Sequence, residues 1–103
     1  MADEVKIRKA RLEDIDSIAD LMYRLKKLNE EFDTNFEVSA NARERIVSGL
    51  KESVPDSKSC LLLVGTVGHK VVSVIKADLR ERKFYDPPID VRITDFYILP
   101  EER

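Results

Sequence analysis

The chain has 103 residues, of which 43% are apolar and 37% charged, and its 18 basic and 20 acidic side chains nearly cancel. This length limits the protein to one domain with a single modest core, and the balanced charge gives no reason to expect binding to nucleic acid or to an anionic membrane. The lone cysteine, Cys60, excludes an intrachain disulfide, and the sequence has neither a secretory signal pattern nor an apolar run that would span a bilayer. A cytoplasmic protein is therefore expected. Its usage of Lys, Arg and Glu is typical of thermophile proteins.

Periodicity predicts a strand and a helix at the N-terminus. Residues 5–9 alternate apolar and basic side chains, which predicts a half-solvated strand with Val5 and Ile7 on one face. From residue 12 the period changes to three and four residues, which predicts a helix of roughly five turns. The apolar positions of its inner stripe are Leu12, Ile15, Ile18, Ala19, Met22, Leu25 and Leu28. Residues 29–38 break this period and are expected to connect two elements.

The middle of the chain predicts a second helix and a hairpin. Ser39 is expected to be the N-cap of the helix, and Pro55, Asp56 and Ser57 are expected to end it. The inner stripe of this helix comprises Ala42, Ile46, Val47, Leu50 and Val54. Two apolar runs of strand type follow, at residues 60–67 and 71–79. The pair Gly68-His69 between them favours a type II′ turn, which prefers glycine at its first central position.

The last part of the chain predicts a loop and a final strand. Residues 80–90 are charged and contain a Pro-Pro pair, so they are expected to form a loop before a strand over residues 91–99. Uniform alternation gives that strand one face with Ile93, Asp95 and Tyr97 and another with Thr94, Phe96 and Ile98. The element order β-α-α-β-β-β predicts an α+β fold, in which two helices pack on a mainly antiparallel sheet.

The stretch TDFYILPEER at the end of the chain resembles the fourth strand of the GNAT superfamily of N-acetyltransferases. In that family an acidic residue precedes a hydrophobic-aromatic-hydrophobic run, and a proline and an arginine follow. Here Asp95, Phe96, Tyr97, Ile98, Pro100 and Arg103 fill these positions. IRKARLEDIDSIADLM is similar to the family's first strand and helix, and LLLVGTVGHKVVSVI to its second and third strands. Ser73 departs from the pattern, because the family usually has a glycine after the valine pair.

The resemblance implies that residues 1–103 are a single partial domain, the N-terminal half of an acetyl-CoA-dependent N-acetyltransferase. The reaction implied is transfer of acetyl to a primary amine of a small molecule or a protein. The main chain of Phe96, Tyr97 and Ile98 would line the acetyl-CoA cleft, and Arg103 would open the pyrophosphate motif R/Q-x-x-G-x-G/A. That glycine-rich loop would follow Arg103, so the present chain is expected to be a truncated piece that is inactive alone and binds acetyl-CoA poorly.

Asp95 is the candidate general base. An acidic residue on this strand, near the acetyl group, can take the proton of the amine directly or through a water. The alternative interpretation is structural: Asp95 hydrogen-bonds a neighbouring backbone group or pairs with a basic residue such as Arg92 or Lys76. Tyr97 has two interpretations as well, since an aromatic side chain on a strand either stacks in the acceptor cleft or packs in the core.

The connection after the first helix is the candidate acceptor site. In the family this connection commonly borders the acceptor cleft, and here Glu30, Glu31 and Asp33 would attract a cationic amine. The alternative is a solvated loop that Phe32 and Phe36 pin to the domain.

Other residues predict no further chemistry. His69 is interpreted as an exposed turn residue and Cys60 as a packing residue, and no spacing of His, Cys, Asp or Glu resembles a metal site. A second hypothesis for the function is a non-catalytic binding or dimerisation module with a half-GNAT sheet. Under either hypothesis, residues 91–99 would expose backbone groups at a sheet edge, which favours pairing with a second copy into a homodimer.

Overall fold

The computed structural model describes residues 4–55 and 59–103, which form two helices and one four-stranded antiparallel sheet. The strands, in their spatial order, are β1 (Val5–Lys9), β2 (Cys60–Val67), β3 (Lys70–Glu81) and β4 (Ile89–Ile98). The helices are α1 (Ile15–Phe32) and α2 (Ala42–Ser53), with 3-10 turns η1 (Leu12–Asp14), η2 (Thr34–Phe36) and η3 (Pro100–Glu102). The predicted α+β class and element order are confirmed. No described helix combines the length and the apolar character needed to cross a membrane.

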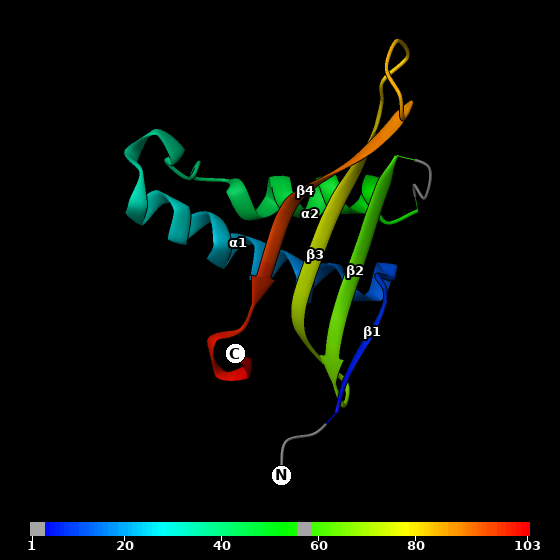
Figure 1. The fold of residues 1–103 in the computed structure, drawn as a ribbon. Coiled ribbons are helices and arrows are strands. Elements are labelled where there is room, and N and C mark those ends of the chain that lie inside the picture. Colours follow the sequence, from blue (N-terminus) through cyan, green and yellow to red (C-terminus); the bar gives the residue numbers. More distant parts are fainter. Residues whose placement is uncertain (1–3, 56–58) are drawn as a thin grey trace.

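Both helices cover the same face of the sheet, so the fold has two layers (Figure 1). α1 contacts α2, β3 and β4. The core lies between the layers and includes Ile18 and Leu50 from the helices, which are 0% and 2% exposed. The sheet contributes the buried side chains Leu62, Val64, Val72, Val74 and Tyr97. The opposite face of the sheet is covered by no element among the described residues.

That opposite face, here called the open sheet face, is largely apolar. Cross-strand pairs place Leu63 beside Ile75 and Ile75 beside Phe96, so apolar residues form a row across β2, β3 and β4. The exposed large side chains of this face are Val5, Ile7, Leu61, Leu79, Ile89, Val91, Ile93 and Phe96. The apolar face predicted for the first strand therefore lies on the uncovered side of the sheet.

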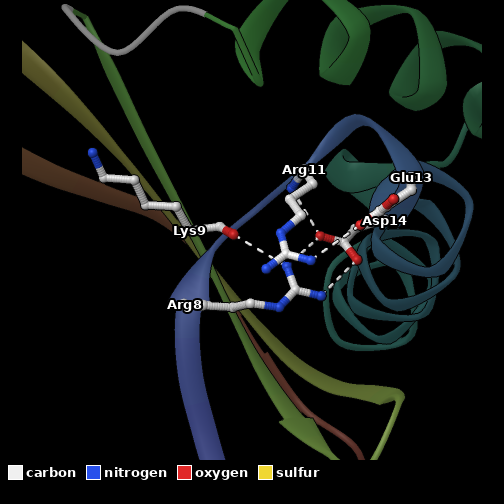
Figure 2. A network of polar contacts seen from close by, with 5 residues as sticks. All are labelled: Arg8, Lys9, Arg11, Glu13 and Asp14. Atoms are coloured by element: carbon white, nitrogen blue, oxygen red, sulfur yellow. Dashed lines mark hydrogen bonds and ion pairs between the residues drawn. The ribbon is translucent and has the colours of Figure 1, made fainter.

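A polar network joins β1 to the start of α1 (Figure 2). The guanidinium of Arg8 donates two parallel hydrogen bonds to the Asp14 carboxylate, at 2.7 Å and 2.9 Å, and the Arg11 backbone N–H donates a third at 2.8 Å. Asp14 is only 6% exposed, whereas the nearby ion pair of Arg11 with Glu13 lies at the surface. Arg8 therefore fixes where the first helix begins relative to the sheet.

The hairpin between β2 and β3 has the predicted two-residue turn. Val67 pairs with Lys70, which leaves Gly68 and His69 as the turn residues. Gly68 has a φ of 61°, and no described non-glycine residue has a positive φ. This agrees with a type II′ turn and excludes type I′, which requires a positive φ at both central residues.

Gly65 in β2 provides the space that Ser73 in β3 needs. The two residues are paired across the strands, and a Cβ atom added at Gly65 would lie 2.2 Å from Ser73 Oγ and 3.3 Å from Ile7 Cδ1. At the position of Ser73, the GNAT family, which this sequence resembles, usually carries a glycine. Here the small residue is on the neighbouring strand instead.

We expect Gly65→Ala to lower the free energy of unfolding by about 1–2 kcal/mol, because the new methyl group must displace Ser73 or Ile7. Ser73→Ala removes the nearest atom, so the same substitution should cost less in that background, and urea unfolding of the four proteins measures the difference. Gly49→Ala is the control: its Cβ meets nothing within 4 Å, and in the middle of α2 it should stabilise by about 0.5–1 kcal/mol. A neutral Gly65→Ala would contradict this account.

The boundaries of both helices differ from those predicted. Leu12 belongs to η1 and is 63% exposed, so it is not part of the core. α1 continues to Phe32, because the first residues of the predicted connection keep the helical backbone, and the Asp33 N–H still bonds to the Asn29 carbonyl. The N-cap of α2 is Asn41 and not Ser39, whose carbonyl accepts a hydrogen bond from the N–H of Ala42, the first residue of the helix. The helix ends at Ser53, and Asp56 and Ser57 lie outside the described residues.

The loop predicted over residues 80–90 is shorter than expected. β3 extends to Glu81 and β4 begins at Ile89, with Arg80 opposite Asp90. Arg80 Nε donates to Asp90 Oδ1 at 3.0 Å, and this cross-strand ion pair suits a ladder position. Arg80 and Asp90, two of the charged residues that suggested a loop, therefore pair across β3 and β4.

Candidate active site

β4 contains a bulge at Thr94. Lys76 of β3 pairs with Asp95, but its neighbour Ala77 pairs with Ile93, so Thr94 is an extra residue in the ladder. The insertion breaks the alternation: Asp95 is buried beneath the helices, whereas Ile93 is 63% exposed on the open sheet face. The prediction that Ile93 and Asp95 share a face is therefore wrong, because uniform alternation takes no account of a bulge.

The Asp95 carboxylate is 6% exposed and has two polar partners. The ammonium of Lys26, from α1, forms an ion pair with Oδ1, and the Thr94 hydroxyl donates to Oδ2 at 3.1 Å. The basic residue that pairs with Asp95 is thus Lys26, and not one of the two examples suggested from the sequence, Arg92 and Lys76. Lys76 instead pairs with Asp78 at 3.0 Å.

A cavity of about 560 Å³ lies beside this ion pair, and we call it the helix cavity. It is bounded by the second half of α1, the connection through η2, the first half of α2, and Thr94 of β4. Both helices run past the edge of β4, and their connection lies beyond that edge (Figure 1). The lining residues are Lys26, Asn29, Asn35, Phe36, Glu37, Val38, Ser39, Ala42, Arg45, Ile46 and Thr94. Its volume is in the range of small-molecule sites.

Asp95 does not line the helix cavity itself, but its carboxylate contacts two residues that do. Lys26 and Thr94 both contact its carboxylate, and both line the cavity wall. A molecule in the cavity therefore meets an ammonium group and a hydroxyl group that are connected to the same buried carboxylate. Such a pair of contacts can pass a proton between the cavity and Asp95.

Of the predicted acceptor residues, Glu30 and Glu31 lie in the last turn of α1 and Asp33 follows it, and none of the three lines the helix cavity. Glu30 accepts from Lys27 Nζ at 2.8 Å and from the Val38 N–H at 2.6 Å, and these bonds lower the pKa of its carboxyl. Asp33 accepts from the backbone N–H of the second residue after it and caps η2, and Glu31 is exposed. Two of the three acids therefore have structural partners, and their role toward an acceptor stays a prediction.

The main chain of β4 has one edge beyond which no described strand lies. The Leu99 N–H donates to the Val72 carbonyl of β3, so by alternation the main chain of Phe96 and Ile98 points to the outer edge. On that edge the Ile98 carbonyl accepts a hydrogen bond from Arg103 Nε at 2.9 Å. The predicted cofactor residues Phe96 and Ile98 thus present backbone groups at an accessible strand edge.

Tyr97 and Arg103 contact each other on the face of β4 that the helices cover. The Tyr97 ring is buried among the helices, and the Arg103 guanidinium lies over it at 5.4 Å from the ring centroid. By the same alternation the main chain of Tyr97 faces β3, so of the three adjacent residues it is the one whose backbone points inward.

Lys26, Thr94 and Arg45 line the cavity but were not among the site residues predicted from the sequence. Lys26 carried a signal, because it lies four residues after Met22 and so continues the buried stripe of α1. A lysine on a buried stripe predicts an acidic partner. Nothing in the sequence indicates the bulge that turns Thr94 toward the cavity.

Comparison with known proteins finds no matching family model and no matching curated protein, but solved structures do match. A possible acetyltransferase from Clostridium difficile 630 is 27% identical, with a TM-score of 0.77 over 96% of this chain and 60% of that chain. A predicted acetyltransferase with acetyl-CoA from Clostridium acetobutylicum is 14% identical, with a TM-score of 0.73 over 97% and 63%. An aminoglycoside 6′-N-acetyltransferase from Acinetobacter haemolyticus is 13% identical, with a TM-score of 0.69 over 95% and 59%. The chain spans about 60% of the length of these proteins.

Proposed function

We propose that this chain, which has the fold of the N-terminal part of the GNAT acetyltransferases, forms the acceptor side of an acetyl-CoA-dependent N-acetyltransferase. The observation that carries the proposal is the meeting of two features at the bulge of β4. Thr94 lines the helix cavity, and a few residues further along the same strand Phe96 and Ile98 turn backbone groups to the outer edge. An acceptor in the cavity and an acetyl group held along that edge would then be neighbours.

The chemistry requires a neutral amine, whose lone pair attacks the thioester carbonyl carbon of acetyl-CoA. A C–N bond forms, the C–S bond breaks, the amine gives up a proton, and the departing thiolate takes one. Asp95 is the proposed general base. Because Asp95 is buried, the proton reaches it through the Thr94 hydroxyl: Thr94 Oγ accepts the proton of the amine as its own proton passes to Asp95 Oδ2.

The acceptor is proposed to be a primary amine. The neighbour from Acinetobacter haemolyticus acts on an aminoglycoside, and the helix cavity has a volume that admits a ligand of moderate size. Acetyl-CoA is the proposed donor, which the neighbour from Clostridium acetobutylicum contains. Arg103 would begin the site for its pyrophosphate.

The test of the proposal is release of free CoA thiol from acetyl-CoA by the product of the complete gene, across a panel of polyamines, amino sugars, aminoglycosides, amino acids and peptides. We expect turnover with at least one amine and none with the corresponding alcohols. The 103 residues alone should give no turnover, since the glycine-rich loop that grips the pyrophosphate in the resembling family would follow Arg103. A complete gene product that transfers acetyl to no amine in the panel would defeat the proposal.

The open sheet face supports a second candidate, a dimerisation module. Contiguous exposed apolar surface of this kind commonly marks an interface, and no described strand pairs with the outer edge of β4. We expect the 103-residue chain to form a dimer through residues 91–99 and the open sheet face, measured by size-exclusion chromatography with light scattering. Ile93→Lys should shift the protein to a monomer. Leu12→Lys, which replaces an equally exposed residue away from this face, should not. A monomeric unmodified chain would count against the second candidate.

A further inference from the structure

The charges on the wall of the helix cavity differ from those expected for a purely cationic acceptor. The charged side chains that line it are Lys26, Arg45 and Glu37, whereas Glu30 and Asp33 are turned to other partners. Lys26 forms an ion pair with buried Asp95, so its charge is already compensated. One arginine and one carboxylate remain to face whatever occupies the cavity.

Arg45 is the cavity cation with a free charge. It lies on the first turn and a half of α2 and is exposed, and it takes part in none of the ion pairs found among the described residues. Its neighbour Arg43, by contrast, pairs with Asp20 of α1 at 3.0 Å. The guanidinium of Arg45 presents donors in a planar fork that matches a carboxylate or a phosphate.

Polar groups near Arg45 complete a site for an anion. Asn29, Asn35 and Ser39 line the same cavity, and residues of these types can supply neutral hydrogen-bond donors from their side chains. Glu37 also lines the cavity and suits the ammonium form in which an amine arrives from solution. A ligand with both an amine and an anionic group would therefore satisfy both remaining charges, while a simple cation would leave Arg45 facing a like charge.

We infer that the acceptor is an amine that also carries an anionic oxygen group, a carboxylate or a phosphate, and that Arg45 binds this group in the helix cavity. The inference rests on the proposed function, because it names the substrate class of that site. It places the anionic end of the acceptor at α2 and its amine toward Thr94 and Asp95 of β4.

The experiment is a titration of the ¹⁵N-labelled 103-residue chain, followed by amide shifts, with O-phosphoethanolamine, β-alanine and ethanolamine. We expect at least one of the two anionic amines to bind about tenfold or more tightly than ethanolamine and to shift amides of residues 35–46. The comparison of phosphoethanolamine with β-alanine separates a phosphate from a carboxylate, and either result supports the inference. Arg45→Gln should abolish the preference, and added salt should weaken it.

Lys51→Gln is the matched control, since it removes the same charge from an exposed position of the same helix that does not line the cavity. It should leave each affinity within about twofold.

Equal binding of all three amines, no binding of any, or equal effects of the two substitutions would overturn the inference. So would a titration with CoA that shifts the same amides, because the anion would then belong to the donor. These readouts involve no acetyl transfer: binding without turnover in the complete gene product would defeat the proposed function alone, and turnover without an anion preference would defeat this inference alone.

Discussion

Asparagine in place of Asp95 is expected to lower the kcat of the complete gene product by about 10²- to 10⁴-fold, with little change in the KM for the amine. Asparagine keeps the size of the side chain but cannot take up the proton that Thr94 would pass to it. The measurement is release of CoA thiol under saturating acetyl-CoA. Because the substitution also leaves Lys26 without its carboxylate, unfolding of the variant must be followed in parallel, and activity is compared below the temperature at which it begins to unfold.

Thr94 provides the control for the route of the proton. Thr94→Ser keeps a hydroxyl beside Asp95 and should retain most of the activity, whereas Thr94→Val keeps the shape and should approach the activity of the Asp95 variant. If valine and serine at this position are equally active, the hydroxyl is not on the path. If Asp95→Asn also retains full kcat, Asp95 serves only as the partner of Lys26.

Asp14→Ala is expected to lower the free energy of unfolding by about 2–4 kcal/mol, the second large effect. The substitution leaves the half-buried Arg8 guanidinium without its carboxylate and removes the acceptor of the Arg11 N–H. Loss of one partner from a buried pair typically costs about 3–5 kcal/mol, and the value here is set lower because Arg8 still reaches water. Glu13→Ala removes the adjacent carboxylate from a solvent-exposed pair and should cost about 0.5 kcal/mol or less. Similar losses for the two variants in urea unfolding would contradict this assignment.

The Asp14 contribution should depend on pH. The hydrogen bonds from Arg8 hold the pKa of the Asp14 carboxyl below its ordinary value, and they outweigh burial, which acts in the opposite direction. A group with a lowered pKa stabilises the fold fully above its ordinary pKa of about 3.9, and the contribution is lost as the pH falls through the folded value. The difference between the unmodified chain and Asp14→Ala should therefore be constant near neutral pH and shrink in acid. Other carboxylates with lowered pKa values are present in both proteins and cancel in the difference.

The fold was largely predictable because its elements have clear periods. The strands over residues 5–9 and 60–67 agree with prediction to the residue, as does the turn at Gly68-His69, since alternation, apolar runs and a glycine turn are local signals. The loop predicted over residues 80–90 was too long for a different reason. Charged residues suggest a loop when each of them is expected to be solvated on its own. Arg80 instead has a partner across the strand ladder, and the sequence does not reveal that partner.

The candidate site was less predictable because its geometry depends on a one-residue bulge in β4. Asp95 was found from the resemblance of its strand, but its environment depends on the bulge at Thr94 and on a lysine that is distant in the sequence. Glu30, Glu31 and Asp33 were predicted from their charge and from the resemblance, because the family's connection after the first helix commonly borders the acceptor cleft. Their backbone and side-chain partners, such as the Val38 N–H for Glu30, exist only once the chain is folded.

The wall of the helix cavity comes almost entirely from one continuous stretch, residues 26–46, while β4 contributes Thr94 alone. None of the fully buried side chains of the core falls between residues 29 and 46. Replacing residues 29–45 with those of a relative would therefore exchange most of the groups that line the cavity, while Lys26 stays paired with Asp95 and Ile46 stays packed against the core. Such a swap offers a route by which selectivity can diverge quickly while the scaffold and the strand with the proposed general base are inherited unchanged.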